Sequence, residues 1–436
     1  MLVSACATYQ PAPLPDSAHA FVPVDLPGLS VDAQKIARPY LTAQAINLSA
    51  PLTPNALAVI AVLENPDLKA QRARIAVADA QVFAARLLPD PTVAGGFDKL
   101  LSGTDPLNGY NSQLALDLSQ LRTARVQRQS GDATKRQVRL DVAWAEWLTA
   151  GQARLQGVRV GALGQQLPLL AASAASAQKL FDVASRASAH GDIAAGELDT
   201  RRQGLLDASD KLRKAQIDFA SATANLVALL GLAPGTELRL APGATAPIAP
   251  SADILAGQAV DRRLDLQALR AGYDVSEADL HKAVLDQFPN LSLSLAYARD
   301  TAGNATISPG VSFSLPLWNR NRGGIAVARA TRAQLRAEYD ARLFQTRAEI
   351  ATAVAGLAAL RRQQAEVATY LPGLERFAAA NARAVRHGDL ASVTAETSQQ
   401  ALRDRQVAWL QLGQQIAEQN IALELLSGGP SESWSK

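Results

Sequence analysis

The sequence predicts a mainly helical fold with a small β part, and three observations support this prediction. Apolar residues make up 48% of the chain but aromatic residues only 5%, so most of the hydrophobic share is Ala, Leu and Val, as is typical of long, closely packed helices. The segments 122–189 and 325–386 contain few helix breakers and no strand pattern. Short stretches elsewhere alternate apolar residues with small ones, which is the period of a β-strand.

The chain is built from two copies of one plan. An Asp-Leu pair, followed by Arg four residues after the Leu, begins at Asp67 and again 198 residues later at Asp265. The His-Gly-Asp string at 190–192 recurs at 387–389, after 197 residues. Because the two offsets nearly agree, they indicate a duplicated unit of close to 200 residues.

The repeats divide the chain into five segments. Residues 1–50 are rich in proline and are predicted to form an extended arm. The first repeat covers 51–232, and the second covers 255–428. Residues 233–254 form a Pro- and Ala-rich linker between them, and 429–436 form a C-terminal tail.

Each repeat is predicted to contain a helix, two short strands and a long helical hairpin, in this order. The strands are expected at about 92–98 and 112–118, and at about 290–298 and 307–317. Each has one apolar face and one small or polar face, which fits either a sheet packed on a protein core or a sheet in a lipid bilayer. Four strands cannot close a barrel, so the membrane alternative requires several chains.

The helical segments are too long for a compact globule. At about 1.5 Å per residue, the segment 122–189 alone would reach about 100 Å. Apolar residues such as Val138 and Val142 recur at spacings of three and four, which predicts a seam for helix packing. Pro168 and Pro372 are expected to interrupt or kink these helices.

The turn of each hairpin carries the same three residue types. The glycine is expected to end the first helix in the left-handed conformation, and the aspartate to cap the next helix. The histidine is favoured by the negative end of the helix dipole, and a ring of such histidines in an oligomer is the metal-sensing alternative. The residues are His190, Gly191 and Asp192, and His387, Gly388 and Asp389.

Charge and motifs exclude several function classes. Lys and Arg number 43 and Asp and Glu 40, a net charge of +3, which disfavours a nucleic-acid partner. We find no phosphate-binding glycine loop, nucleophile elbow or zinc-protease motif, so an enzyme is not expected. With one Cys and four His in the sequence, neither a metal centre nor a cofactor is predicted. We also expect no transmembrane helix, because charged or amide residues recur every few positions.

The cysteine stands near the start of the chain, after small residues. The string from Leu2 to Cys6 resembles a lipobox, at which Cys6 would become a lipid anchor. The charged part and most of the apolar part of a signal sequence are missing before it, so the start of the sequence is expected to be truncated or misassigned. The alternative is an ordinary small residue near the terminus.

The order of these features resembles the TolC-type outer-membrane efflux proteins over residues 51–428. The resemblance rests on the tandem repeats, the lipobox-like start, the tip pattern after Gly388 and the segment 314–323. Within that segment, the string from Pro316 to Gly323 is similar to the heavy-metal branch of the family, the CzcC-like proteins that serve resistance-nodulation-division (RND) pumps.

The resemblance implies a tandem-repeat outer-membrane factor that works as a homotrimer. Four strands per chain would form a 12-stranded β-barrel in outer-membrane lipid, continued by an α-helical coiled-coil tunnel across the periplasm. The tips would dock a periplasmic adaptor protein, and an inner-membrane RND pump would supply the energy. The duct itself would be passive and lipid-anchored in the bacterial outer membrane, with heavy-metal cations as a candidate cargo.

In relatives, the periplasmic narrowing carries acids six and nine residues after the tip glycine. The matching residues here are Glu197 and Thr200, and Thr394 and Thr397, with Glu396 beside the second pair. We hypothesise that a ring of Glu197 side chains, together with Glu396, sets a preference for cations and helps to hold the resting tip closed; the alternative is that Glu197 is a solvated acid on a helix face.

A second reading of the whole chain is a soluble or lipid-tethered, elongated coiled-coil scaffold without a pore. In that case the apolar faces of the strands would be buried in protein, and the chain would be extracted without detergent.

Overall fold

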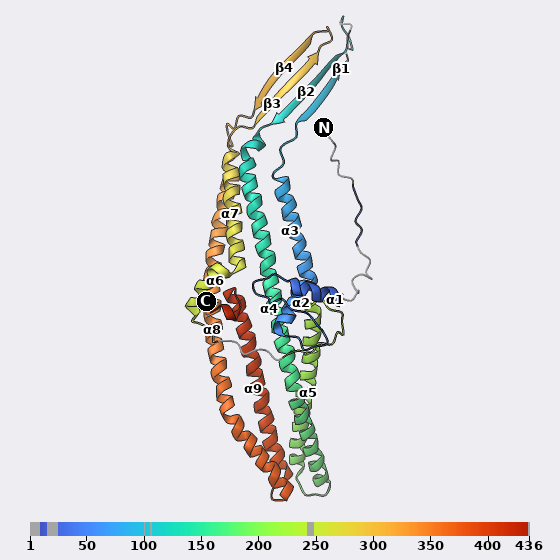
Figure 1. The fold of residues 1–436 in the computed structure, drawn as a ribbon, viewed down its shortest axis with the longest axis vertical. Helices are drawn as coiled ribbons and strands as arrows, with labels where there is room; N and C mark the ends of the chain where they lie inside the picture. The colour runs from blue at the N-terminus through green and yellow to red at the C-terminus, as the bar shows by residue number, and fades with distance from the viewer. Residues whose placement is uncertain (1–8, 15–24, 100, 105–106, 242–247, 435–436) are drawn as a thin grey trace. The chain divides into compact units, whose positions relative to one another are not determined.

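The computed structural model describes residues 9–14, 25–99, 101–104, 107–241 and 248–434. The fold is mainly helical with one four-stranded antiparallel sheet, which confirms the predicted fold class (Figure 1). Two compact units are present. Unit 1 comprises Met1–Pro66, Leu148–Pro247 and Ala355–Ala422, and unit 2 comprises Asp67–Trp147, Ile248–Val354 and Leu423–Lys436. Each unit takes residues from both repeats, so the units do not follow the repeat boundaries.

Both repeats have the same order of elements. The first contains α2 (Pro54–Glu64), α3 (Pro66–Ala84), β1 (Thr92–Asp98), β2 (Gly109–Asp117), α4 (Ser119–Ala189) and α5 (Ala195–Leu229). The second contains α6 (Ala252–Arg262), α7 (Leu264–Leu285), β3 (Leu291–Arg299), β4 (Ala305–Phe313), α8 (Arg322–His387) and α9 (Ser392–Ser427). Two helices therefore precede each strand pair, where we predicted one.

The extra helix boundary has a local cause in the first repeat. Asn65 precedes Pro66, and a residue before proline is driven out of the helical region. Asn65 accordingly has φ −56° and ψ 122°, and its side chain donates to the carbonyl of Leu229 (2.9 Å). Arg263 occupies the corresponding position in the second repeat, with φ −68° and ψ 119°.

The segment 1–50 is not wholly extended as predicted. It contains α1 (Leu26–Lys35), which starts with Pro27 in the first turn, where a proline is tolerated because that N–H has no helical partner. Leu29 and Ala33 of α1 are buried in the core of unit 1. The sequence pattern of this segment does not reveal α1, because the helix is stabilised by packing on residues elsewhere in the chain.

Unit 1 has its core around α2. Every residue from Ala56 to Val62 is at most 5% exposed, so this short helix is apolar all round and fully enclosed. Leu226 and Leu230 at the end of α5 and Ala153 of α4 belong to the same cluster. The hydroxyl of Thr53 caps α2 by accepting from the N–H of Ala56 (3.1 Å).

Unit 2 contains the sheet, whose strands lie in the order β1-β2-β3-β4 (Figure 1). β1 has its predicted bounds, and β2 and β3 differ from prediction by one to three residues. β4 ends at Phe313, four residues earlier than predicted. Pro316 lacks the N–H that a ladder needs, so the strand stops before it.

The long helices continue through their prolines. α4 contains Pro168 and α8 contains Pro372, so the predicted interruption of these helices is wrong. The predicted tail also packs on the fold, because Trp434 is buried and its Nε1–H donates to the hydroxyl of Ser427 (3.1 Å) at the end of α9.

Candidate functional site

The two faces of the sheet differ in chemistry. Directly paired residues of antiparallel strands lie on the same face, so Leu295 shares its face with Leu114 and Pro309. The apolar face contains the following exposed side chains: Val93, Phe97, Tyr110, Leu114, Leu291, Leu293, Leu295, Tyr297, Ile307, Val311 and Phe313. Their exposed fractions range from 37% at Tyr297 to 78% at Val93. An apolar surface of this extent is unusual for a monomeric protein in water.

The opposite face carries only small or polar residues. Ser294 of the central strand β3 pairs with Ala115 on one side and Gly310 on the other. The remaining members, taken from the same registers, are Thr92, Ala94, Gly96, Asp98, Gly109, Asn111, Gln113, Asp117, Ser292, Ala296, Ala298, Thr306, Ser308 and Ser312. The sheet therefore presents one greasy and one hydrophilic surface.

Both edges of the sheet are unpaired in the described part of the chain. β1 and β4 are its edge strands, and within the described ranges no further strand pairs with either. Their outer backbone groups are free to bond a strand from another chain. Pro309 lies in β4, where an edge position tolerates a residue without an N–H.

The hairpin turns confirm the predicted role of the glycines. Gly191 and Gly388 both have φ +82°, a left-handed conformation that glycine adopts without strain. The N–H of Asp192 donates to the carbonyl of Ala187 (2.9 Å), and that of Gly191 to the carbonyl of Ser188 (3.0 Å), which closes α4 in a Schellman motif. The second turn repeats this pattern at the end of α8.

The predicted capping role of the aspartates is wrong. The N-cap of α5 is Ala194, which makes no side-chain cap bond, and Asp192 stands two residues before it. α9 begins at Ser392, three residues after Asp389. Each aspartate instead closes the preceding helix through its backbone N–H, and the chain needs further residues to turn before the next helix starts. The side chains of Asp192 and Asp389, like those of His190 and His387, are exposed.

Glu197 lies in the first turn of α5 with its side chain 52% exposed. Its Oε1 is 3.6 Å from Nη2 of Arg201 on the same helix face. Thr200 is one turn further on, and its hydroxyl donates to the carbonyl of Gly196 (2.9 Å). Both side chains are thus at the surface of unit 1.

In α9, Thr394 and Thr397 are exposed, and the hydroxyl of Thr397 donates to the carbonyl of Val393 (2.9 Å). Glu396 differs, because its Oε2 accepts a hydrogen bond from the hydroxyl of Ser176 on α4. Nη2 of Arg403 lies 4.0 Å from the same carboxylate, and Nε of Arg403 donates to the hydroxyl of Ser173 (3.2 Å).

These four residues, Ser173, Ser176, Glu396 and Arg403, form an inter-repeat link between the two hairpins within unit 1. Both serines are buried, at 5% and 6% exposure. Sequence reasoning placed Glu396 beside the threonines of α9 and did not find its partners. The available signal was a pair of serines spaced by three in an Ala-rich stretch of α4, which is the spacing of one helix face.

Each repeat is closed by the same contact at its helix ends. Asn65 donates to the carbonyl of Leu229 (2.9 Å), and Nη1 of Arg263 donates to the carbonyl of Leu426 (3.3 Å). The glycine after each returning helix, Gly231 or Gly428, has positive φ and packs against the backbone of the residues at this boundary. A Cβ on Gly231 would lie 2.5 Å from the carbonyl oxygen of Glu64, so only glycine fits.

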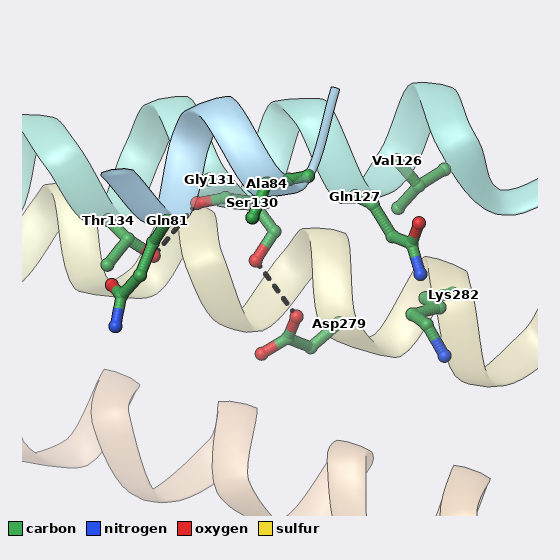
Figure 2. Close-up of a pocket in the computed structure, with 10 residues that line it drawn as sticks. Gln81, Ala84, Val126, Gln127, Ser130, Gly131, Thr134, Asp279 and Lys282 are labelled. Atoms are coloured by element: carbon green, nitrogen blue, oxygen red, sulfur yellow. Dashed lines mark hydrogen bonds between the residues drawn. The ribbon is translucent and has the colours of Figure 1, made fainter. Parts of the chain in front are cut away.

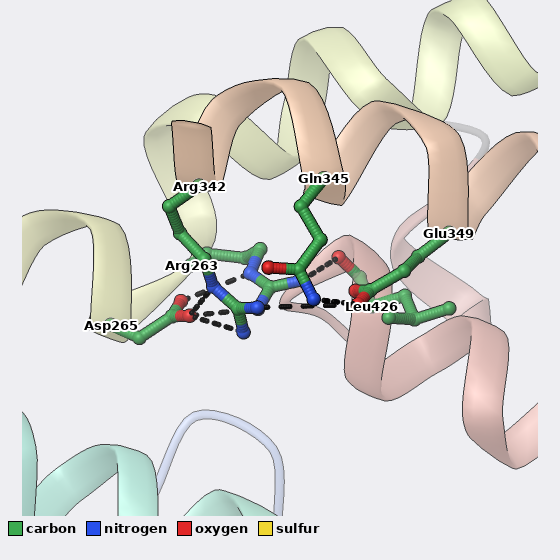
Figure 3. A network of polar contacts seen from close by, with 6 residues as sticks. All are labelled: Arg263, Asp265, Arg342, Gln345, Glu349 and Leu426. Atoms are coloured by element: carbon green, nitrogen blue, oxygen red, sulfur yellow. Dashed lines mark hydrogen bonds and ion pairs between the residues drawn. The ribbon is translucent and has the colours of Figure 1, made fainter. Parts of the chain in front are cut away.

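Arg263 is the centre of a buried polar network in unit 2 (Figure 3). Its side chain is 1% exposed, forms two hydrogen bonds to Asp265 (2.9 and 2.7 Å) and stacks 5.0 Å from the ring centre of Trp144. Nη2 of Arg342 also reaches Asp265 (3.0 Å). Burial by itself raises the pKa of Asp265, but the hydrogen bonds and charges of the two arginines outweigh it, so the pKa lies below its ordinary value.

Unit 2 also contains a pocket of about 410 Å³ between α3, α4 and α7 (Figure 2). Its polar lining includes Ser130, whose hydroxyl donates to Asp279 (3.0 Å), and Lys282, whose ammonium pairs with Asp286 (2.8 Å). These groups satisfy one another, and the lining residues include no histidine or cysteine. The arrangement supports no catalytic chemistry that we can derive.

Two negative findings hold for the described part of the chain. No helix there combines the length and apolar content that crossing a bilayer requires. The same residues include no group of three or more His, Cys, Asp or Glu side chains that could hold a metal ion. Cys6, the predicted lipid anchor, lies outside the described residues.

Comparisons with known proteins agree with this architecture. Residues 255–429 match the family model described as outer membrane efflux protein. The solved structure of the Campylobacter jejuni CmeC outer membrane channel is 16% identical with a TM-score of 0.69, over 86% of this chain and 85% of CmeC. VceC, an outer membrane protein of Vibrio cholerae, is 18% identical with a TM-score of 0.69, over 86% and 96%. The outer-membrane channel OprN is 17% identical with a TM-score of 0.68, over 98% and 100%.

A search of curated proteins gives no match. The chain therefore has the fold of these outer-membrane channels. Its second repeat also carries the sequence pattern of the outer membrane efflux protein family.

Proposed function

We propose that this protein is the outer-membrane channel component of an efflux system. The observation that carries the proposal is the four-stranded sheet, whose apolar face is exposed while the other face is small and polar. In a bilayer the apolar face would meet lipid and the hydrophilic face would line a lumen. The shared fold and the family match of residues 255–429 support the same conclusion.

The open edges of the sheet support a homotrimer. An unpaired strand edge is not viable in lipid, and four strands are too few to close. Three copies would contribute 12 strands, which lies within the range of known outer-membrane barrels. Pairing β1 of one copy with β4 of the next would satisfy the free backbone groups of both strands.

The hairpin tips are the surfaces that we propose for docking a periplasmic adaptor, which would connect the channel to an inner-membrane RND pump. The tip residues from His190 to Asp192 and from His387 to Asp389 are exposed and precede the returning helices α5 and α9. The channel would then act as a passive duct for which the pump supplies the energy, as the resemblance implies.

Glu197 is the residue that we propose for the constriction. Its carboxylate is half exposed, whereas that of Glu396 is engaged with Ser176 and Arg403. Three copies of Glu197 around a narrow axis would concentrate negative potential and favour cations. Thr200, Thr394 and Thr397 would add neutral hydroxyl groups to the same region, so the acidic ring would rest on Glu197.

The resemblance of the string from Pro316 to Gly323 to the heavy-metal branch makes metal cations the cargo that we propose. Cys6 is proposed as the lipid anchor in the outer membrane. Deletion of the gene should sensitise cells to metal salts, and Cys6→Ser should leave the protein unlabelled by radioactive fatty acid.

The channel proposal is tested by reconstituting the detergent-extracted protein in planar bilayers. We expect a trimer by size and a cation-selective conductance. Glu197→Ala should lower the cation preference, while Asp199→Ala, which removes another exposed acid two residues away, should leave it unchanged. Extraction without detergent and absence of conductance would instead support the coiled-coil scaffold.

A further inference from the structure

One exposed aromatic and basic surface is not explained by the channel function. The loop between β4 and α8 carries Leu315, Leu317 and Trp318, whose exposed fractions are 63%, 60% and 86%. Leu315 and Leu317 follow Phe313 at intervals of two, so they extend the odd-numbered apolar positions of β4 beyond the end of the strand. We call these three residues, together with Arg320 and Arg322, the collar.

The loop holds the collar in a fixed and unusual backbone conformation. Arg320 and Asn321 have φ +45° and +50°, which non-glycine residues rarely adopt. The side-chain amide of Asn321 donates to the carbonyl of Ala283 in α7 (2.8 Å), and Nε of Arg320 donates to the carbonyl of Pro316 (3.4 Å). The exposed Trp318 therefore lies in a loop that hydrogen bonds hold in place.

Positive charge gathers at the collar. Arg322 opens α8, and the first turn of this helix contains no acidic residue. Arg122 of α4 lies beside the loop. Its Nη2 donates to Oδ1 of Asn290 (3.4 Å), and the backbone N–H of Asn290 donates to the hydroxyl of Ser314, a loop residue (3.2 Å). Arg122 thus lies beside the loop that carries Arg320, Arg322 and the exposed Trp318.

Asp117 lies beside Arg122, and its carboxylate is already engaged. Oδ1 of Asp117, the last residue of β2, accepts a hydrogen bond from the N–H of Ser119 (2.8 Å) at the start of α4. The carboxylate therefore serves the helix start, and Arg320 and Arg322 are left to face solvent.

We infer that the collar binds the phosphate-bearing headgroups of anionic glycerophospholipids in the periplasm-facing leaflet. This inference rests on the proposed channel function, because the loop after β4 reaches the surface of the bilayer only if the sheet is inserted in the membrane. Tryptophan favours the membrane–water interface, and the guanidinium fork matches phosphate oxygens. The collar joins both chemistries and follows β4 directly in the chain.

The test measures lipid retained by the full-length protein after reconstitution in phosphatidylcholine vesicles with and without phosphatidylglycerol. After gentle delipidation, native mass spectrometry counts the bound phosphatidylglycerol. Arg320→Gln combined with Arg322→Gln should weaken retention, by about fivefold for each arginine removed. The matched control is Arg362→Gln with Arg383→Gln, which removes two exposed charges from α8 in unit 1 and should leave retention unchanged.

A second readout locates the tryptophan. The fluorescence of Trp318, taken as the difference between wild type and Trp318→Phe, should be quenched by phospholipid brominated near the headgroup. Absence of this quenching, or equal phosphatidylglycerol retention by wild type and the collar variant, would overturn the inference. Displacement of the lipid by inorganic phosphate alone would also overturn it, since it would show a simple anion site.

Failure of the inference can be told apart from failure of the proposed function. A wild-type protein that inserts and conducts, but retains phosphatidylglycerol no better than the collar variant, contradicts the headgroup site alone. A wild-type protein that does not enter vesicles overturns both.

Discussion

The substitution Leu295→Lys tests whether the apolar face of the sheet meets lipid. Leu295 is the fifth of nine residues in the central strand β3, and its side chain is 50% exposed. Its cross-strand partners, Leu114 and Pro309, lie on the same face. In a transmembrane sheet this position lies near the middle of the bilayer. The adjacent Ala296 faces the other way, between Gln113 and Ser308, and provides the control Ala296→Lys.

The expected magnitude follows from the depth of the side chain. A lysine on the lipid face near the bilayer midplane costs about 2–4 kcal/mol, whereas a lysine facing a water-filled lumen costs much less. The folded population of each chain should therefore fall by roughly 30-fold or more relative to the unfolded one. A trimer carries three copies of the substitution, so the free-energy cost of assembling one trimer is three times the cost for a single chain.

The assay compares the trimer recovered from outer-membrane fractions and its resistance to urea in vesicles. Leu295→Lys should reduce both strongly, Leu295→Phe should retain both, and Ala296→Lys should resemble wild type while shifting the single-channel conductance. Wild-type trimer levels for Leu295→Lys would refute the lipid-facing assignment. An equal loss for Ala296→Lys would refute the distinction between the two faces.

Three further outcomes are expected from the remaining contacts. Asp265→Asn should lower the free energy of unfolding by about 3–5 kcal/mol, because it leaves the buried guanidinium of Arg263 without its carboxylate. In the wild type the folded-state pKa of Asp265 lies below its unfolded-state pKa of about 3.8. The stabilisation by the Asp265 carboxylate is therefore fully present above pH 3.8 and is lost as the pH falls through the folded-state pKa. Thermal unfolding at a series of acid pH values measures this loss. Glu396→Ala should cost about 1–3 kcal/mol and increase amide exchange around Ser176, since the buried hydroxyl loses its acceptor. Gly388→Ala should cost about 1 kcal/mol and Gly388→Asn less, as measured by thermal unfolding, because φ is +82° there.

The elements with strong local signals were predictable from the sequence. Period-two alternation located all four strands, and the absence of breakers located the long helices. The glycines at 191 and 388 predict a left-handed conformation, because helix ends favour a residue without a Cβ there. Errors occurred where two local preferences compete. Asp192 is a good capping residue by type, but its N–H is committed to closing α4, and the next helix starts later.

The assignment of Glu197 and its neighbours to a constriction stays a prediction, and the structure adds only the surroundings of their side chains. Glu197 is an exposed acid in a first helix turn, as its sequence position suggested. The sequence predicts a similar environment for Glu396, yet Glu396 accepts a hydrogen bond from Ser176, a residue 220 positions away in the sequence. No periodicity in one segment can reveal which residue of a distant segment faces it.

The sequence by itself determined the duplication, the order of elements in each repeat and the two chemically distinct faces of the strands, because these depend on neighbours within a few residues. Tertiary structure alone decided that the compact units cut across the repeats, that Arg263 is buried with Asp265 and Leu426, and that the loop from Leu315 to Arg322 presents its collar to the surroundings. Those features arise from contacts between segments far apart in the chain, whose free energies depend on burial and geometry that no local pattern records.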